Sequence, residues 1–434
     1  MKNKSPRIFA MTLMGLAMTF ATTVFAVDTQ TTIYNFQNKA TGANPESGVI
    51  ADAAGNLYGT TTLGGSCTLT KQGCGIVFEL SPSSSGRWTE TVLHTFTAGT
   101  TDGYQPQAGL AFDSSGNLYG TTAGGGTGTA CSEGCGTIYE LQPQSGGGWL
   151  ETILYNFTNG SDGASPTGNL VLDADGNIYG TTLGGSNSDG TVFELTSTGT
   201  FTTIFTFATG QGRWPQSGVI FDSAGNLYGT TMIGGDVSGT WGCANFSGCG
   251  VVFKLTPSST GWRYSQIYVF HGPGGARPFG GLVFDAAGNL YGTTLNGGTS
   301  TYPGFGTVFE LSPTTTGGPW KETLLHAFTG GSDGGYPQAT LAIDSAGTLF
   351  GITPGAKTPS VPSTAFRLSP ASGGGWQFQV LTTLSAGSGF FVTAPPYRNA
   401  AGDMFSTSYG SGSTLCNGGC GFVYELSPVT ASRR

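Results

Sequence analysis

Short apolar runs alternate with polar segments rich in Gly, Asn, Asp, Ser and Pro along the chain. One stretch shows the pattern clearly, with apolar runs at 109–113, 117–122, 136–141 and 150–157 separated by turns or a Gly-rich loop. Runs of this length, rich in β-branched and aromatic residues and bounded by turn formers, predict β-strands. Because the connections are mostly short, we expect consecutive strands to pair in an antiparallel four-stranded meander.

This unit recurs through the chain. The string GNLYGTT, or a degenerate copy of it, begins at Gly55, Gly116, Gly176, Gly225, Gly288, Gly347 and Gly402. The copies start 49 to 63 residues apart. A four-stranded repeat with this spacing predicts one propeller blade per copy. We therefore expect an all-β protein whose residues 27–434 form a single seven-bladed β-propeller domain with four-stranded antiparallel blades.

The fourth strand of the unit occurs only six times after the repeats begin, at 89–96, 150–157, 201–207, 264–270, 321–328 and 378–384. The seventh copy has only SPVTASRR after its third strand, whereas residues 31–36 (TTIYNF) precede the first copy and resemble a fourth strand. We expect residues 31–36 to complete the last blade by pairing near 422–426. Such pairing closes the ring and removes an open sheet edge.

The connections divide into two sets by face. The 1–2 and 3–4 turns (DxxGN and SPxxxGxW) are short and uniform, whereas the 2–3 and 4–1 loops are long and variable. In a meander these two sets lie on opposite faces. Variable loops on a rigid scaffold are typical of a binding face. The DGxxP motifs on that face make Asp102, Asp162 and Asp333 candidate ligand-binding residues.

Composition and charge narrow the class of protein. Only 9% of the residues are charged, 37% are hydrophobic, and Gly is 76 of 434 without a G-X-Y period, which excludes collagen and disorder. Without Lys2, Lys4 and Arg7 the chain has 13 basic against 24 acidic residues, a net charge of 13 − 24 = −11. This balance excludes a basic nucleic-acid footprint and a basic membrane-binding patch.

The first 26 residues have the organisation of a signal peptide. A positive start is followed by an apolar run over 8–25, and Val24-Phe25-Ala26 is suited to cleavage after Ala26. An uncleaved membrane anchor is the alternative. We expect a secreted or periplasmic protein with no membrane insertion after cleavage.

The cysteines occur in local pairs, each in a 2–3 loop just before a third strand. The eight residues are Cys67, Cys74, Cys131, Cys135, Cys243, Cys249, Cys416 and Cys420. In an exported chain this spacing predicts the disulfides 67–74, 131–135, 243–249 and 416–420. A zinc site is the alternative, but no second pair or His lies nearby in sequence. We expect no metal and no cofactor.

Few residues suggest catalysis. His94 and His326 occupy a fourth-strand position that other copies fill with Tyr or Phe, which favours a packing role. His271 lies in a 4–1 loop and is a candidate ligand contact. Arg398 stands in the first strand of the last copy, where the other copies are apolar, so it is either a polar group near the channel or a product of repeat decay.

The repeated Asp of the DxxG turns suggests a carboxylate ring or calcium sites, but turn formation explains it better. The unit contains no nucleophile-elbow or phosphate-loop pattern. We therefore assign no catalytic residues.

The unit DxxGNLYGTTxxGG…GTVFELSP…WxETLLHxF…DGxxP resembles the GloVer-type tandem repeat of exported bacterial proteins. The resemblance covers about 31–426; the first five copies fit closely, and the sixth and seventh depart from it. It implies an exported propeller and brings no catalytic residues with it.

We expect a non-catalytic binding or interaction propeller whose extracellular ligand is a glycan, another extracellular polymer or a protein, and which is a monomer. The alternatives are a propeller lyase or hydrolase with its site on the loop-rich face, and a purely structural surface protein.

Overall fold

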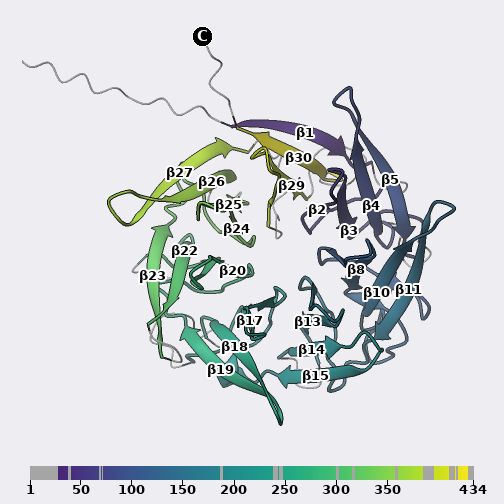
Figure 1. Cartoon of the computed structure of the whole chain (residues 1–434), viewed down its shortest axis with the longest axis horizontal. Coiled ribbons are helices and arrows are strands. Elements are labelled where there is room, and N and C mark those ends of the chain that lie inside the picture. Colours follow the sequence, from purple (N-terminus) through teal and green to yellow (C-terminus); the bar gives the residue numbers. More distant parts are fainter. Residues whose placement is uncertain are drawn as a thin grey trace, which may run out of the picture.

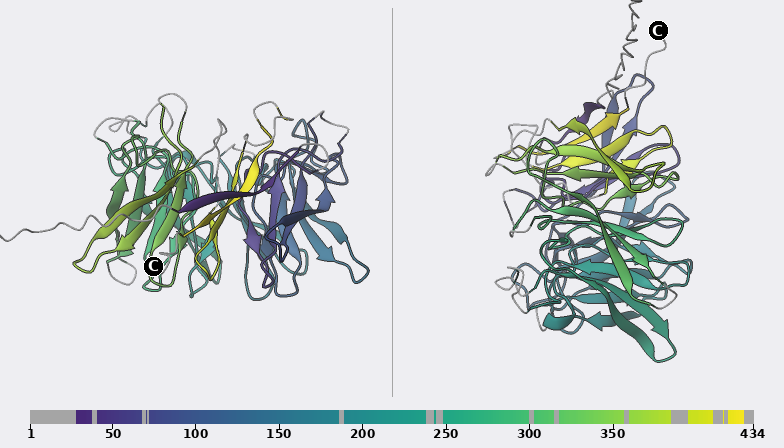
Figure 2. Two further views of the ribbon diagram at one scale, coloured as in Figure 1. Left: turned by 90° about the horizontal axis from the view of Figure 1, so that it is seen from above. Right: turned by 90° about the vertical axis from the view of Figure 1, so that its left-hand side faces the viewer.

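The computed structural model describes residues 28–37, 41–67, 70, 72–185, 189–237, 243, 248–299, 303–314, 318–356, 360–384, 395–409, 416 and 419–428. The predicted signal peptide, 1–26, lies outside the described residues. The described chain forms seven four-stranded antiparallel sheets arranged as blades of a flat ring (Figures 1 and 2). This confirms the predicted seven-bladed propeller. Within these ranges no helix is long and apolar enough to cross a membrane.

Each blade runs from a short inner strand to a long outer strand. The inner strands are β2 (Ile50–Ala51), β7 (Ala111–Phe112), β12 (Val171–Leu172), β16 (Ile220–Phe221), β20 (Val283–Phe284), β24 (Ala342–Ile343) and β28 (Tyr397–Arg398). The second strands are β3 (Leu57–Thr61), β8 (Leu118–Thr122), β13 (Ile178–Thr182), β17 (Leu227–Thr231), β21 (Leu290–Thr294), β25 (Leu349–Thr353) and β29 (Met404–Ser408).

The third strands are β4 (Ile76–Pro82), β10 (Thr137–Pro143), β14 (Thr191–Leu195), β18 (Val251–Ser258), β22 (Thr307–Pro313), β26 (Thr364–Pro370) and β30 (Phe422–Ser427). The outer strands are β5 (Trp88–Thr95), β11 (Trp149–Asn156), β15 (Phe201–Thr206), β19 (Gly261–Val269), β23 (Trp320–Ala327), β27 (Trp376–Thr383) and β1 (Thr29–Asn35). A further pair, β6 (Gly103–Tyr104) with β9 (Gly124–Gly125), joins two loops, and Thr209–Gln211 form the 3-10 turn η1.

The N-terminal strand closes the ring as predicted. β1 pairs with β30 from Thr29 opposite Ser427 to Asn35 opposite Phe422, so the strand begins two residues before the predicted 31–36. Figure 1 shows this strand lying along the outer side of the last blade. The last blade is therefore built from both ends of the propeller domain.

The recurring Gly-Thr of GNLYGTT serves the packing of neighbouring strands and blades. A Cβ on Gly59 would lie 2.6 Å from the Phe78 ring, so only glycine allows this ring to cross the second strand. The next residue, Thr60, donates its hydroxyl to the Ala108 carbonyl of the following blade at 3.0 Å. The same inter-blade bond joins Thr181 to Ser217, Thr230 to Gly280, Thr293 to Ala339 and Thr407 to Ser47, and Thr121 bonds the next blade two residues earlier, at the Pro166 carbonyl.

In six of the 4–1 loops that the structure describes, a proline packs against the preceding blade. Gln105 adopts a left-handed φ of 57° and donates its N–H to the Cys74 carbonyl at 3.0 Å. The next residue, Pro106, packs on Gly75, where a Cβ would lie 2.5 Å from the proline ring. Five more residues before a loop proline are left-handed, namely Asn44, Ser165, Trp214, Arg277 and Tyr336. The DGxxP and CG motifs are thus two halves of one inter-blade contact.

The DxxGN motif forms a capped turn. Asp113 accepts the N–H groups of Ser115 and Asn117 on Oδ1, and the Asn117 side-chain amide and the Tyr119 hydroxyl on Oδ2. In the last blade the two residues are exchanged: Asn399 donates its Nδ2 to Asp403 at 3.0 Å. These contacts agree with the turn-forming interpretation of the repeated Asp.

All four predicted disulfides are present, Cys67–Cys74, Cys131–Cys135, Cys243–Cys249 and Cys416–Cys420. Their Cα–Cα distances, 5.0 to 5.5 Å, are normal for the bond. Four disulfides indicate an exported protein, because cytosolic thiols are kept reduced.

Candidate functional site

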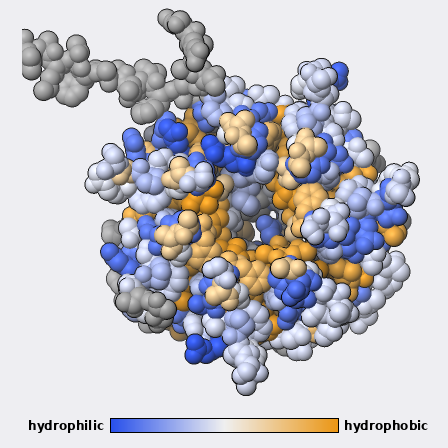
Figure 3. All heavy atoms as spheres, viewed as in Figure 1, coloured by the Kyte–Doolittle hydropathy of each residue, from blue (hydrophilic) through white to orange (hydrophobic). Residues whose placement is uncertain are grey.

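A cavity of about 310 Å³ lies in the central channel, along the inner strands of the blades. Figure 3 shows the ring hollowed at its centre, with hydrophobic residues gathered around the hollow. The cavity begins where the 4–1 loops enter the blades, because its lining includes the residues just before β12, β16, β20 and β24 and a loop residue before β7. It is therefore approached from the face with the variable loops.

Amide and hydroxyl side chains form the rim of this cavity. They are Ser47, Gln107, Thr167, Asn169, Gln216, Ser217 and Thr340. Some hold neighbouring blades together: Asn169 accepts the Gly109 N–H at 2.8 Å, and Thr340 accepts the Gly281 N–H at 2.7 Å. The blade contacts thus fix where these polar groups stand.

Other polar groups of the rim have capacity left for a ligand. The buried Thr167 hydroxyl has no hydrogen-bond partner among the described residues. Among the described residues, the polar contact of the Gln216 side chain is a 3.9 Å approach of its amide to the Met232 sulfur, a weak acceptor. A buried polar group without a protein partner needs water or a ligand. The rim can therefore bind a polar ligand without breaking the fold.

Below the rim the channel wall is apolar. Val171, Ile220 and Val283 are half-buried inner-strand residues that line the cavity. Among the described lining residues none is ionisable. The cavity therefore offers hydrogen bonds and apolar contact, but no group for acid–base chemistry.

These channel residues were missed at the sequence level, although a signal exists. Gln107, Thr167, Gln216 and Phe279 each follow the loop proline directly, so this variable position lines the channel in four blades. Glu46 has the same position in the first blade but does not line the cavity. Burial raises the pKa of Glu46 to about 7, although a hydrogen bond to Thr62 acts to lower it.

The three DGxxP aspartates are enclosed by their own loops. Asp102 and Asp162 are buried, and each accepts the N–H and hydroxyl of the threonine that follows the outer strand, at 2.7 Å. Asp333 accepts the Thr329 N–H at 2.9 Å and also its hydroxyl. Burial acts to raise the pKa of Asp102, but hydrogen bonds from His94 and Thr97 outweigh it and hold the pKa below its usual range. These contacts order the loops.

His271 and Arg398 lie at other places in the ring. His271, half-exposed, has its Nδ1 3.3 Å from Asp236. Arg398 lies 3.5 Å from Asp344 and stacks over Phe350, 4.4 Å from the ring centre. The structure thus spreads the five candidate residues over several blades and does not form one site from them.

The position of Arg398 has a structural explanation. In the sixth blade Thr348 and Phe350 replace the Asn and Tyr that donate to the turn aspartate in other blades, so Asp344 lacks those two donors. Arg398 of the next blade lies beside Asp344 in their place.

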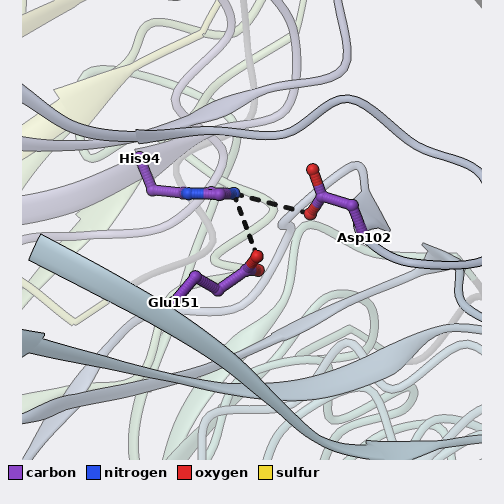
Figure 4. A group of neighbouring side chains, drawn as sticks. All are labelled: His94, Asp102 and Glu151. Atoms are coloured by element: carbon purple, nitrogen blue, oxygen red, sulfur yellow. Dashed lines mark hydrogen bonds and ion pairs between the residues drawn. The ribbon is translucent and has the colours of Figure 1, made fainter.

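One cluster combines an imidazole with two carboxylates. Figure 4 shows the His94 ring pointing its Nε2 between Asp102 and Glu151, at 3.4 and 3.5 Å. Burial raises the pKa of Glu151 to about 7, although the nearby His94 acts to lower it. The three donor atoms lie close enough together to hold a metal ion.

Comparison with other blades favours a structural role for this cluster. The same outer-strand position bonds the carboxylate of the next blade at Tyr34–Glu90, 2.8 Å, and at Tyr268–Glu322, 2.5 Å. It bonds the loop aspartate at Tyr155–Asp162, 3.2 Å. His94 makes both contacts at once and therefore helps to hold the first and second blades together.

The sequence profile of a family described as the Gloeobacter/Verrucomicrobia repeat matches residues 3–182, 68–240, 127–364 and 239–433. No curated protein matches the chain.

Several solved propellers are similar in fold. An ancestral GH74 enzyme has a TM-score of 0.52 at 10% identity, over 91% of this chain and 52% of its own. The extracellular domain of a putative hybrid two-component system from B. thetaiotaomicron has a TM-score of 0.49 at 11% identity, and the match spans 91% of this chain and 40% of that one. A periplasmic gluconolactonase from Pseudomonas aeruginosa has a TM-score of 0.46 at 13% identity, over 82% and 96% of the two chains. At such identities the likeness concerns the fold alone.

Proposed function

The chain belongs to the Gloeobacter/Verrucomicrobia repeat family, and from that premise we propose that it is an exported, non-catalytic propeller that binds a neutral saccharide in its central channel. The channel lining carries this proposal. Its described residues provide amides and hydroxyls above an apolar wall, with no ionisable side chain. Saccharides present hydroxyls and apolar ring faces, and both kinds of group match this lining.

The absence of titratable groups among these lining residues also argues against hydrolysis in the channel. Glycoside hydrolysis generally needs a pair of carboxyl groups flanking the bond. The carboxylates nearest to a catalytic arrangement, Asp102 and Glu151, lie on outer loops and strands and fasten blades together. A binding role therefore fits the described chemistry better than a lyase or hydrolase role.

The test is a panel of neutral oligosaccharides titrated into the full chain by calorimetry, with product analysis to detect turnover. We expect at least one neutral oligosaccharide to bind without being cleaved. Gln107→Leu together with Gln216→Leu should weaken this binding at least tenfold, because two rim amides are removed. Binding that ignores both substitutions, or a cleaved oligosaccharide, would contradict the proposal.

The matched control is Gln144→Leu. Gln144 is an exposed residue of a 3–4 turn, on the face away from the loops, and its amide bonds only the local Gln142 carbonyl at 3.1 Å. This change removes an amide of the same kind without touching the channel. It should leave saccharide binding unchanged.

A further inference from the structure

A second cavity, of about 680 Å³, lies between the fourth and fifth blades on the face with the short turns. Its walls come from the β18–β19 hairpin on one side and from the start of β23 on the other (Figure 1). Turn residues Ser223 and Gly288 mark its mouth on the short-turn face. The cleft is therefore separate from the channel and is not covered by the variable loops.

The charge of this cleft is inverted relative to the equivalent surface of most blades. At the middle of the third strand, opposite the Tyr or Phe of the second, five blades carry a glutamate: Glu79, Glu140, Glu194, Glu310 and Glu425. The fourth blade carries Lys254 there, opposite Tyr228. The exchange replaces a negative group by a positive one in a wall of the cleft.

A second cation stands beside the first. Arg263 pairs across the hairpin with Thr256, two residues beyond Lys254 on the same side of the strand. Both cations line the cleft, and neither forms an ion pair with any residue that the structure describes. In the fifth blade the same two positions hold Glu310 and Lys321, whose charges offset each other. At these two positions the fourth blade therefore has two positive side chains, whereas the fifth blade has one negative and one positive side chain.

Asp222, the one carboxylate among the described residues that line the cleft, is already hydrogen-bonded. Asp222 accepts the N–H groups of Ala224 and Asn226, the Asn226 side-chain amide and the Tyr228 hydroxyl. Burial acts to raise the pKa of Asp222, but these hydrogen bonds outweigh it and hold the pKa below its usual range. Its charge is thus directed into its own turn and leaves the cations available.

Aromatic rings complete the walls. Trp320 packs edge-on against Tyr228, with ring centres 6.0 Å apart, and Phe284 packs against Tyr228 at 5.1 Å. All three rings line the cleft, together with Ser265 and Gln266. Aromatic faces suit the apolar faces of sugar rings, and cations suit a carboxylate. The cavity is also far larger than a single small anion requires.

We propose that this cleft binds a carboxylate-bearing sugar unit of an acidic polysaccharide. The carboxylate lies between Lys254 and Arg263, and the sugar ring packs on the Trp320 side. The cleft extends the protein's ligands beyond the neutral saccharide of the channel, from a site on the opposite face. In a protein of net negative charge, a local pair of cations gives an acidic chain a favourable place to bind.

The test uses a short oligogalacturonate titrated into the full chain by calorimetry, at low and at physiological salt. We expect binding that weakens as salt rises, and Lys254→Glu should reduce the affinity at least tenfold. This substitution restores the residue found in five other blades, so the fold should tolerate it. Arg87→Glu, on an exposed turn of the first blade, changes the net charge equally and should leave the affinity unchanged.

Three outcomes would overturn the proposal. They are no binding of the oligogalacturonate, equal loss with Lys254→Glu and Arg87→Glu, and inorganic phosphate or acetate competing as strongly as the oligosaccharide. The first two outcomes would show that the cleft does not bind the oligosaccharide specifically. The third would show that the cleft binds small anions without recognising the sugar. The channel variants Gln107→Leu and Gln216→Leu should not affect this titration, so the two sites fail or succeed independently.

Discussion

Two boundaries between blades differ in the residues that hold them together. One lies between the fourth and fifth blades, and the other between the sixth and seventh. At the first, Thr230 bonds the Gly280 carbonyl at 3.1 Å, and Tyr228 packs against Phe284 and Trp320. At the second, Ile352 replaces the threonine, and Phe350 replaces the tyrosine beneath Arg398. One boundary is held by a neutral hydrogen bond and edge-to-face ring contacts, the other by a cation over a ring and an ion pair.

The comparison teaches that a degenerate repeat keeps its fold when a neighbour supplies the lost interaction. Asp344 has lost its asparagine and tyrosine donors and has an arginine of the next blade beside it. In the last blade the turn survives because Asn399 and Asp403 have exchanged donor and acceptor. What matters at each position is a complementary group across the contact, whichever blade provides it.

The largest effect should come from opening the ring at the boundary that closes it. Deleting residues 27–36 removes β1 and leaves β30 as an exposed edge, which should cost several kcal/mol or cause aggregation. Thermal unfolding and light scattering measure both. Addition of a synthetic peptide of residues 29–36 should restore stability, and a deleted chain that stays monomeric and equally stable would show that the strand does not close the ring.

Removing the substitute contact should cost less. Arg398→Leu takes away the cation over Phe350 and leaves Asp344 without its ion pair, so we expect a loss of about 2 kcal/mol in the free energy of unfolding. Urea denaturation gives this value. Arg87→Leu on an exposed turn is the control and should change it by less than about 0.5 kcal/mol. Equal effects of the two variants would mean that Arg398 is no more than a surface charge.

Stability should depend on pH through the outer-strand carboxyls. Burial raises the pKa of Glu90 and Glu151 to about 7, although their partners Tyr34 and His94 act to lower it. A raised folded pKa contributes stability that is fully present below the unfolded value near 4.5 and is lost as pH rises through about 7. We expect the ionisation of each group to lower the free energy of unfolding by about 1–2 kcal/mol as the pH rises from 5 to 8, after allowance for partial exposure.

The turn aspartates limit stability on the acid side. Hydrogen bonds outweigh burial and lower the pKa of Asp52, Asp222 and Asp285, so their contribution is lost as pH falls below about 4. The melting temperature should therefore be highest near pH 4–5. Glu90→Gln should flatten the fall toward pH 8, and an unchanged pH profile in this variant would argue against the assignment.

The smallest effect should come from one inter-blade hydrogen bond at the complete boundary. Thr230→Val keeps the shape of the side chain and removes its bond to the Gly280 carbonyl, which should cost about 1 kcal/mol. The control is Thr198→Val on an exposed turn, where no such loss is expected. A loss of stability no larger than that of the control would show that the Thr230–Gly280 hydrogen bond contributes nothing measurable.

Local sequence patterns were enough to predict the blade number, the strand order, the closing strand and the disulfides. Short apolar runs predict the strands, Gly and Asp predict the turns between the first and second strands, and the count of outer strands identifies 31–36 as the missing partner. Cysteines separated by four to seven residues can only meet locally once the loop between them folds back.

The directions in which the candidate side chains point could not be predicted from the sequence, because they depend on the folded ring. Asp102 and Asp162 stand on variable loops, yet their carboxylates turn inward onto Thr97 and Thr158. The channel rim and the cleft of Lys254 and Arg263 are assembled from residues that are far apart in sequence or belong to different blades. Their direction depends on how neighbouring blades pack, and no local pattern encodes this packing.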